Sequence, residues 1–209
     1  KARAIVMRDT DRDLTSVVVV RADAPMRTPG GVLGKTVAVG ASDSPQATLI
    51  PLWYLAEAGL KPGADFEVLR HDLLVGKHGD HIGGEREAAR ALIAGRAQAA
   101  CMIDGNHLAF SQEGTLPAGS TRILAQTPPY DHCNFTVLDG VPEEPLRRFT
   151  ELLLAMSYDD PAVRTLLDLE GLKTWLPGRL EGYAQLTRAV DAFGTLDPWL
   201  ARATRGLCA

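Results

Sequence analysis

The chain has 209 residues, a formal net charge of −4 and a sequence pI of about 5.7, and 45% of its residues are hydrophobic. This length and apolar content suffice for one large domain or two smaller lobes with packed cores, and they exclude a disordered chain. The acidic balance, without runs of like charge, excludes nucleic acid and anionic membrane surfaces as expected partners. No apolar stretch approaches the roughly 20 residues that cross a bilayer, so we expect no membrane insertion.

The N-terminus and the cysteines carry little information about compartment. The chain begins at Lys1 without a secretory signal segment, so we expect an N-terminus that was processed, truncated or left out. Cys101, Cys133 and Cys208 lack the C-x-x-C spacing of zinc ribbons and redox motifs. We therefore expect no disulfide scaffold.

Strands and helices alternate through the first two thirds of the chain. The β-branched run Ser16–Arg21 predicts a strand covered on both faces of a sheet. A second strand at 36–40 leads into a helix that Gly59 ends. Further strands are predicted at 66–70, 98–103 and 121–125, and a further helix at 85–94. This alternation predicts an α/β sheet.

The turn between the second strand and its helix is rich in hydrogen-bonding groups. Ser44 fits a helix N-cap before proline, with Ser42 and Gln46 on either side. Free N–H groups at a helix start, together with hydroxyls, offer several donors to an anion. The alternative is an ordinary capped connection. Because Pro51 has no N–H, we expect the regular helix to begin near Thr48 or to kink there.

The character of the chain changes beyond Gln126. A proline-led segment enters one strand at 135–138, and apolar residues at helical spacing follow in 145–156. We interpret residues 175–183 as a loop between two helices. Aspartate–proline pairs predict helix starts and glycines predict helix ends here, at Asp160-Pro161, Asp197-Pro198, Gly171 and Gly194. These helices need a sheet, and this part of the chain supplies about one strand of it.

Three polar clusters follow strand ends or the crossover. They consist of His78, Asp80 and His81, of Asp104, Asn106 and His107, and of Asp131, His132 and Cys133. Strand ends and crossovers converge in an open α/β sheet, so we expect these clusters to face one cleft. The alternative for each histidine is a hydrogen bond within its own loop.

Two chemical alternatives concern these clusters. His78 and His81 have a spacing that can bring two imidazoles to one metal ion if the turn is helical. Cys133 beside His132 resembles a nucleophile and its base, but adjacent strand residues point to opposite faces, so the base would have to come from elsewhere. We therefore do not expect an enzyme.

Five segments resemble one family in order and spacing: SVVVVRAD, GKTVAVG, SPQATLIPLWYLAEAGL, VGKHGDHIGGEREAARALIAGRAQAACMIDGN and TPPYDHCNF. This is the phosphate/phosphite/phosphonate-binding (PhnD-like) family of ABC-transporter solute-binding proteins, in the type II periplasmic-binding-protein superfamily. The resemblance implies two α/β lobes joined by two crossover strands. Residues 16–125 would form a complete lobe, and residues 1–15 and 126–209 would belong to the other. The opening βαβα portion of that other lobe has no counterpart here.

The resemblance also implies a ligand site. The phosphonate site of the family is similar to a Ser-Thr-Ser-Gly turn, and the residues that align with it are Ser44, Pro45, Gln46 and Ala47. One hydroxyl of three is retained. His78 falls where family members often have Gly-Ser-His.

We therefore predict a solute-binding protein that captures a small anionic or polar ligand, such as a phosphonate-like oxyanion or an organic acid, between closing lobes. By resemblance its partner is an ABC transporter permease and its location is periplasmic. No cofactor and no catalytic residue are expected. The alternative is an intracellular enzyme or metal-binding protein on the same scaffold, with His78, His81 and His132 as metal ligands. The predicted ligand-binding residues are Ser42, Ser44, Gln46, His78, His81, Asp104, Asn106, Asp131 and His132.

Overall fold

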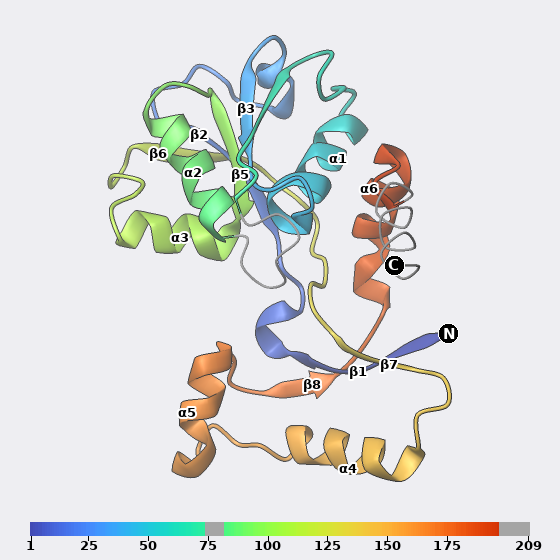
Figure 1. The fold of residues 1–209 in the computed structure, drawn as a ribbon. Helices are drawn as coiled ribbons and strands as arrows, with labels where there is room; N and C mark the ends of the chain where they lie inside the picture. Colours follow the sequence, from blue (N-terminus) through green and yellow to red (C-terminus); the bar gives the residue numbers. More distant parts are fainter. Residues whose placement is uncertain (74–81, 197–209) are drawn as a thin grey trace. The chain divides into compact units, whose positions relative to one another are not determined.

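The computed structural model describes residues 1–73 and 82–196, which divide into two compact units (Figure 1). Unit 1 comprises residues 1–14 and 129–184, and unit 2 comprises residues 15–128 and those from 185 onward. Each unit combines a sheet with helices. Among the described helices, none has the length and apolar character that crossing a membrane would require.

Unit 2 is built on a five-stranded sheet in the order β4-β3-β5-β2-β6. β3 pairs in parallel with β4 and β5, whereas β2 is antiparallel to β5 and β6. β2 spans Ser16–Arg21, as predicted, and its first five residues are buried. The other strands are β3 (Thr36–Val39), β4 (Glu67–Arg70), β5 (Ala99–Ile103) and β6 (Thr121–Gln126). The prediction of an α/β sheet is confirmed.

Helices cover both faces of this sheet (Figure 1). Alternate residues of β2 divide between two cores, because successive strand side chains point to opposite faces. Val17 and Val19 pack on the side of α2 and α3, while Val18 and Val20 pack on the side of α1. The bounds are α1 (Ile50–Glu57), α2 (Ile82–Ile93) and α3 (Asp104–Gln112), with short helical turns η2 (Pro29–Val32) and η3 (Pro45–Leu49).

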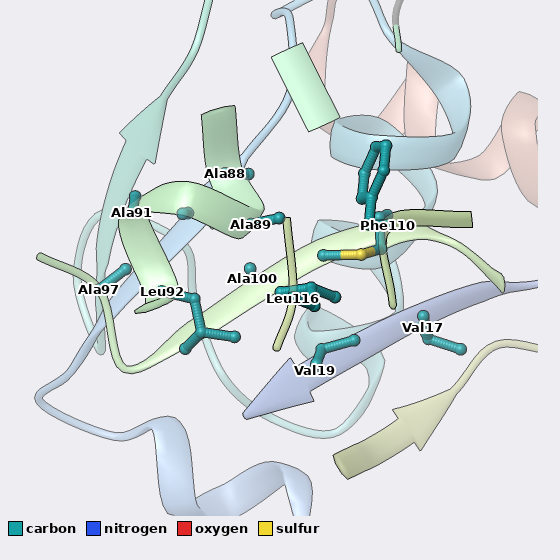
Figure 2. Packing of buried hydrophobic residues seen from close by; sticks show 12 residues of the cluster. Val17, Val19, Ala88, Ala89, Ala91, Leu92, Ala97, Ala100, Phe110 and Leu116 are labelled. Carbon is teal, nitrogen blue, oxygen red and sulfur yellow. The ribbon is translucent and has the colours of Figure 1, made fainter. Parts of the chain in front are cut away.

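Small and large side chains alternate in the core under α2. Ala88, Ala91 and Leu92 of α2 belong to one buried cluster with Phe110 of α3 (Figure 2). The alanines let the helix backbone approach the strands closely, and Phe110, which is fully buried, supplies the bulk.

Unit 1 contains a three-stranded antiparallel sheet in the order β7-β1-β8. Val6 of the central strand packs with Leu153, Leu167 and Trp175 in one core. Gly171 follows α5 with φ 68°, the left-handed conformation that ends a helix, as predicted. The bounds are β1 (Ala2–Arg8), η1 (Asp9–Asp11), β7 (Phe135–Leu138), α4 (Glu143–Leu154), α5 (Pro161–Glu170), β8 (Trp175–Pro177) and η4 (Glu181–Tyr183).

One segment differs from the sequence-based interpretation, and the last described helix groups with unit 2. Residues 175–183 are not simply a loop between helices, because 175–177 form β8 and pair with β1. A strand this short, ending in proline, exists only through its partner. The last described helix is α6 (Ala184–Phe193), and from Gln185 on it groups with unit 2, where the ring of Phe193 packs edge-on against Trp53 at 6.5 Å.

A buried ion pair holds together the two chain segments that leave unit 1. Asp131 is 1% exposed, and its carboxylate accepts hydrogen bonds from Arg179 Nε (2.6 Å) and Nη2 (2.7 Å) and from the backbone N–H of Asp13 (3.1 Å). Asp131 N also donates to the carbonyl oxygen of Gly182. A Cβ at position 182 would overlap the Asp131 carboxylate, so this close approach requires glycine.

We expect Phe110→Ala to lower the free energy of unfolding of unit 2 by about 3–5 kcal/mol, because the lost ring leaves a cavity in the core. Leu108→Ala on the same helix is the matched control. Leu108 is 60% exposed, so its loss should change the free energy by no more than about 0.5 kcal/mol. Urea unfolding of both variants measures the difference, and equal midpoints would contradict this account of the core.

We expect Gly182→Ala to destabilise the protein by about 2–4 kcal/mol, because the new methyl group forces the Asp131 carboxylate away from Arg179. The control is Gly105→Ala in α3, where a Cβ meets no atom within 4 Å. That change should leave stability the same or raise it by up to about 1 kcal/mol, since alanine favours helix. Thermal unfolding in which both variants behave alike would show that residue 182 tolerates a side chain.

Candidate functional site

Three segments of unit 2 meet at one end of its sheet, and two glycines permit the approach. A Cβ on Gly40, after β3, would lie 2.8 Å from the Cβ of Ala47. A Cβ on Gly84, in the first turn of α2, would lie 2.8 Å from the carbonyl oxygen of His71 and 3.0 Å from the backbone nitrogen of Ala41. The turn after β3, the end of β4 and the start of α2 are therefore packed backbone to backbone.

Ser44 caps the helical segment that follows β3. Its Oγ accepts a hydrogen bond from Ala47 N (3.2 Å), and its carbonyl oxygen accepts one from Leu49 N (3.0 Å). The predicted N-cap is confirmed. The first turn is a wide π-type turn, and the regular helix begins at Ile50, slightly later than the expected Thr48, so that Pro51 lies in its first turn, where no N–H is needed.

Buried polar atoms without partners lie directly after this cap. Gln46 is 9% exposed, and its carbonyl oxygen accepts a hydrogen bond from Ser16 Oγ at 2.5 Å. Its side-chain Oε1 and the hydroxyl of Thr48 are buried and have no hydrogen-bond partner in the described part of the protein. Such atoms are rare in folded proteins because each costs free energy, so a bound molecule that pairs with them would be favoured.

The acidic groups around this turn are occupied by the protein itself. Asp72 accepts from Ser42 N at 2.6 Å. Asp104 Oδ2 accepts from Thr15 Oγ1 at 2.7 Å, and its Oδ1 accepts from Gly105 N at 2.7 Å. Asn106 donates to the buried carboxylate of Glu85 at 2.9 Å. Asp104 and Asn106 thus follow the end of β5 as predicted, and both are held by neighbours.

Three open hollows on unit 2 lie away from this turn. Their volumes are about 340, 550 and 350 Å³, and their lining includes Arg21, Lys35 and Phe66. None of the predicted ligand-binding residues lines them.

A second polar cluster lies in unit 1. His132 Nδ1 is 3.4 Å from Asp11 Oδ1 and 3.1 Å from Cys133 Sγ, and the His132 side chain is 21% exposed. Burial alone would lower the pKa of His132, but hydrogen bonds to Asp11 and Cys133 raise it to about 9. Asp11 also pairs with Arg8, from Oδ2 to Nε at 2.5 Å and from Oδ1 to Nη2 at 3.1 Å.

The expected divergence of Cys133 from His132 is wrong. Residues 131–134 form no strand, so the rule that successive side chains point to opposite faces does not apply to them. The thiol and the imidazole instead meet at 3.1 Å.

Asp131, also predicted as a ligand residue, is buried in its ion pair with Arg179. Burial tends to raise the pKa of Asp131, and the hydrogen bonds from Arg179 lower it below its usual range.

The predicted residues His78 and His81 lie outside the described residues. Sequence reasoning missed Asp11, Arg8, Thr48, Glu85 and Arg179. The sequence did offer one signal for Glu85, because this acidic residue stands at the start of a predicted helix. Nothing local indicated Arg179, which is 48 positions from its partner Asp131.

Comparisons with known proteins agree on one family. A family model described as ABC transporter, phosphonate, periplasmic substrate-binding protein matches residues 1–183. No curated protein matches the sequence. Among solved structures, the chain is similar to PhnD1 from Prochlorococcus marinus in complex with methylphosphonate, with a TM-score of 0.70 and 15% identity over 92% of this chain and 71% of that chain.

Two further structures are similar. XAC2383 from Xanthomonas citri bound to ATP has a TM-score of 0.68 and 17% identity, covering 90% of this chain and 69% of that one. A binding protein component of an ABC phosphonate transporter (PA3383) from Pseudomonas aeruginosa has a TM-score of 0.60 and 11% identity, covering 97% of this chain and 74% of that one. At these identities the likeness shows the fold, which is that of the type II periplasmic binding proteins, as predicted.

The family model covers most of the chain, and the fold agrees with it. Members of this family are solute-binding proteins and not enzymes, which is what the sequence predicted. The chain belongs to the family of periplasmic substrate-binding proteins of phosphonate ABC transporters.

Proposed function

We propose that this protein captures a small oxyanion of the phosphonate class at the turn between β3 and α1 and delivers it, in the periplasm, to the permease of an ABC importer. Family membership supports the ligand class and the partner. PhnD1 of Prochlorococcus marinus was solved with methylphosphonate. The observation that carries the proposal for this chain is the pair of buried, unpartnered polar atoms on Gln46 and Thr48.

The chemistry of the turn fits a tetrahedral oxyanion. The Gln46 amide can rotate to present its NH₂ group, and the hydroxyls of Ser44 and Thr48 each carry a proton that can be donated. The hydroxyl of Ser44 already accepts from Ala47 N, which orients that proton away from the helix. Hydrogen bonds to a charged acceptor contribute about 1.5–3 kcal/mol each, enough to offset the ordering of three side chains.

Closure of the two units would complete capture. A ligand that contacts unit 2 alone stabilises no particular arrangement of the units, whereas one that also contacts unit 1 favours the closed form by the free energy of those added contacts. The permease would then distinguish loaded from empty protein by this population shift.

Calorimetric titration with methylphosphonate, inorganic phosphate and sulfate tests the proposal. We expect saturable binding of methylphosphonate with one ligand per chain. In Ser44→Ala the affinity should fall by the equivalent of about 1–3 kcal/mol, because one donor to the anion is lost. Absence of binding for all three anions would contradict the proposal.

Asp160→Ala separates ligand binding from helix capping. Asp160 caps α5 in unit 1 by accepting from Ala162 N at 2.9 Å, so its loss should cost about 1 kcal/mol of stability, as the loss of the Ser44 cap does. Its affinity for methylphosphonate should equal that of the wild type. If both variants lose affinity equally, the role of Ser44 is confined to the helix cap.

We expect Gln46→Met to raise the stability of the protein and to lower its affinity for methylphosphonate. The apolar side chain has similar length and removes a buried unpartnered oxygen, so the free energy of unfolding should rise by about 1 kcal/mol. The same change removes a donor to the oxyanion, so affinity for methylphosphonate should fall. Thermal unfolding without ligand and calorimetry with ligand measure the two effects. Lower stability together with unchanged affinity would show that Gln46 serves the fold alone.

A further inference from the structure

Three side chains of different chemistry converge in unit 1, far from the turn of unit 2 in sequence. Asp11 comes from η1 after β1, and His132 and Cys133 precede β7. Each residue offers one ligand atom, and these three atoms lie within 4.8 Å of one another. They are a carboxylate oxygen, an imidazole nitrogen and a thiol sulfur. Asp11 is buried, whereas His132 and Cys133 are partly exposed, so the open side of the group faces solvent.

The spacing of these atoms is close to that of tetrahedral ligands around one small cation. With Zn²⁺ bonds of about 2.3 Å to sulfur and about 2.0–2.2 Å to nitrogen and oxygen, neighbouring ligands lie about 3.6 Å (S to N) and about 3.4 Å (N to O) apart. The observed distances are 3.1 Å from Cys133 Sγ to His132 Nδ1 and 3.4 Å from His132 Nδ1 to Asp11 Oδ1. The third edge, between the Cys133 sulfur and an Asp11 oxygen, lies within 4.8 Å, so all three ligand atoms are near enough to reach one ion after small side-chain adjustments.

Arg8 holds Asp11 Oδ2 more closely than Oδ1, the oxygen that would bind a metal ion. Its Nε holds Oδ2 at 2.5 Å, while Oδ1, which faces His132, is held only at 3.1 Å by Nη2. The guanidinium also donates to the carbonyl oxygen of Glu170 at 2.9 Å, which fixes its position independently of Asp11. Arg8 thereby orients the carboxylate as the outer partners of metal ligands do.

We propose that Asp11, His132 and Cys133 form a binding site for a divalent transition metal of the Zn²⁺ class, with a fourth coordination position open to solvent. The three ligand types, carboxylate, imidazole and thiolate, favour metals of this class. Thiolate and imidazole are ligands of Zn²⁺ and its neighbours in the transition series, whereas Ca²⁺ and Mg²⁺ require oxygen ligands. Its three residues belong to unit 1, whereas the residues of the oxyanion turn belong to unit 2.

Cobalt titration of the reduced, chelator-treated protein tests the site. Tetrahedral Co²⁺ bound to a thiolate gives a charge-transfer absorption in the near ultraviolet, and Zn²⁺ should abolish it by displacement. We expect one Co²⁺ per chain with this absorption in the wild type, and none of it in Cys133→Ser. His132→Gln and Asp11→Asn should weaken Zn²⁺ binding by more than about tenfold, since even partners that only orient a ligand contribute that much.

Cys101→Ala and Cys208→Ser are the thiol controls. Cys101 is fully buried in unit 2, and burial raises the pKa of its thiol to about 12, so it supplies no thiolate. Both controls should keep the absorption and the affinity of the wild type. Absence of the absorption in the wild type, its persistence in Cys133→Ser, or unchanged Zn²⁺ affinity in both His132→Gln and Asp11→Asn would overturn the site. Methylphosphonate binding by the metal-free wild type, measured in parallel, reports on the oxyanion turn separately, and circular dichroism with thermal unfolding shows that each variant is folded.

Discussion

The arrangement of the candidate site in unit 2 depends on one buried carboxylate, that of Glu85. Glu85 lies in the first turn of α2, is fully buried, and accepts from the backbone N–H of Ile103 and from the Asn106 side chain, both at 2.9 Å. A buried charge is tolerated only when hydrogen bonds compensate it, so α2 has to begin where β5 ends. Gly84 is thereby brought against His71 and Ala41, and the turn after β3 is confined between α2 and the start of α1.

The elements that the sequence predicted are those whose cause is local. Ser16–Arg21 is a run of β-branched residues, and Gly171 has no Cβ to oppose a left-handed backbone. β8 was missed because its three residues have no strand pattern of their own and become a strand by pairing with Val6, Met7 and Arg8. The contact of α6 with unit 2 has a similar cause, since the rings of Phe193 and Trp53 belong to residues 140 positions apart and leave no trace in local spacing.

The same distinction applies to the candidate sites. The Ser44 cap was predictable because its partner, Ala47 N, is three residues away. Asp11 and His132 are separated by 121 positions, so no spacing rule could bring them together. For Cys133 a local rule was available, but it gave the wrong result. A local rule for strands was applied to residues 131–134, which adopt an irregular backbone, and the rule then separated two side chains that the structure brings into contact. Periodicity is informative only where the backbone is regular.

If the oxyanion binds at this turn, as proposed, the turn also limits how tightly a simple phosphonate can be held. Relative to the Ser-Thr-Ser-Gly turn that it resembles, Ser44-Pro45-Gln46-Ala47 lacks two hydroxyls, and proline removes one backbone N–H as well. Two charge-assisted hydrogen bonds correspond to about 3–6 kcal/mol, or a factor of roughly 100 or more in affinity. Gln46 can restore one of them if its amide turns its NH₂ group toward the ligand. The unpartnered Oε1 then needs a donor, and a ligand that carries a hydroxyl or amine beside its phosphonate group supplies it, whereas the methylphosphonate dianion does not. This chemistry favours a larger, donor-bearing phosphonate over the simplest member of the class.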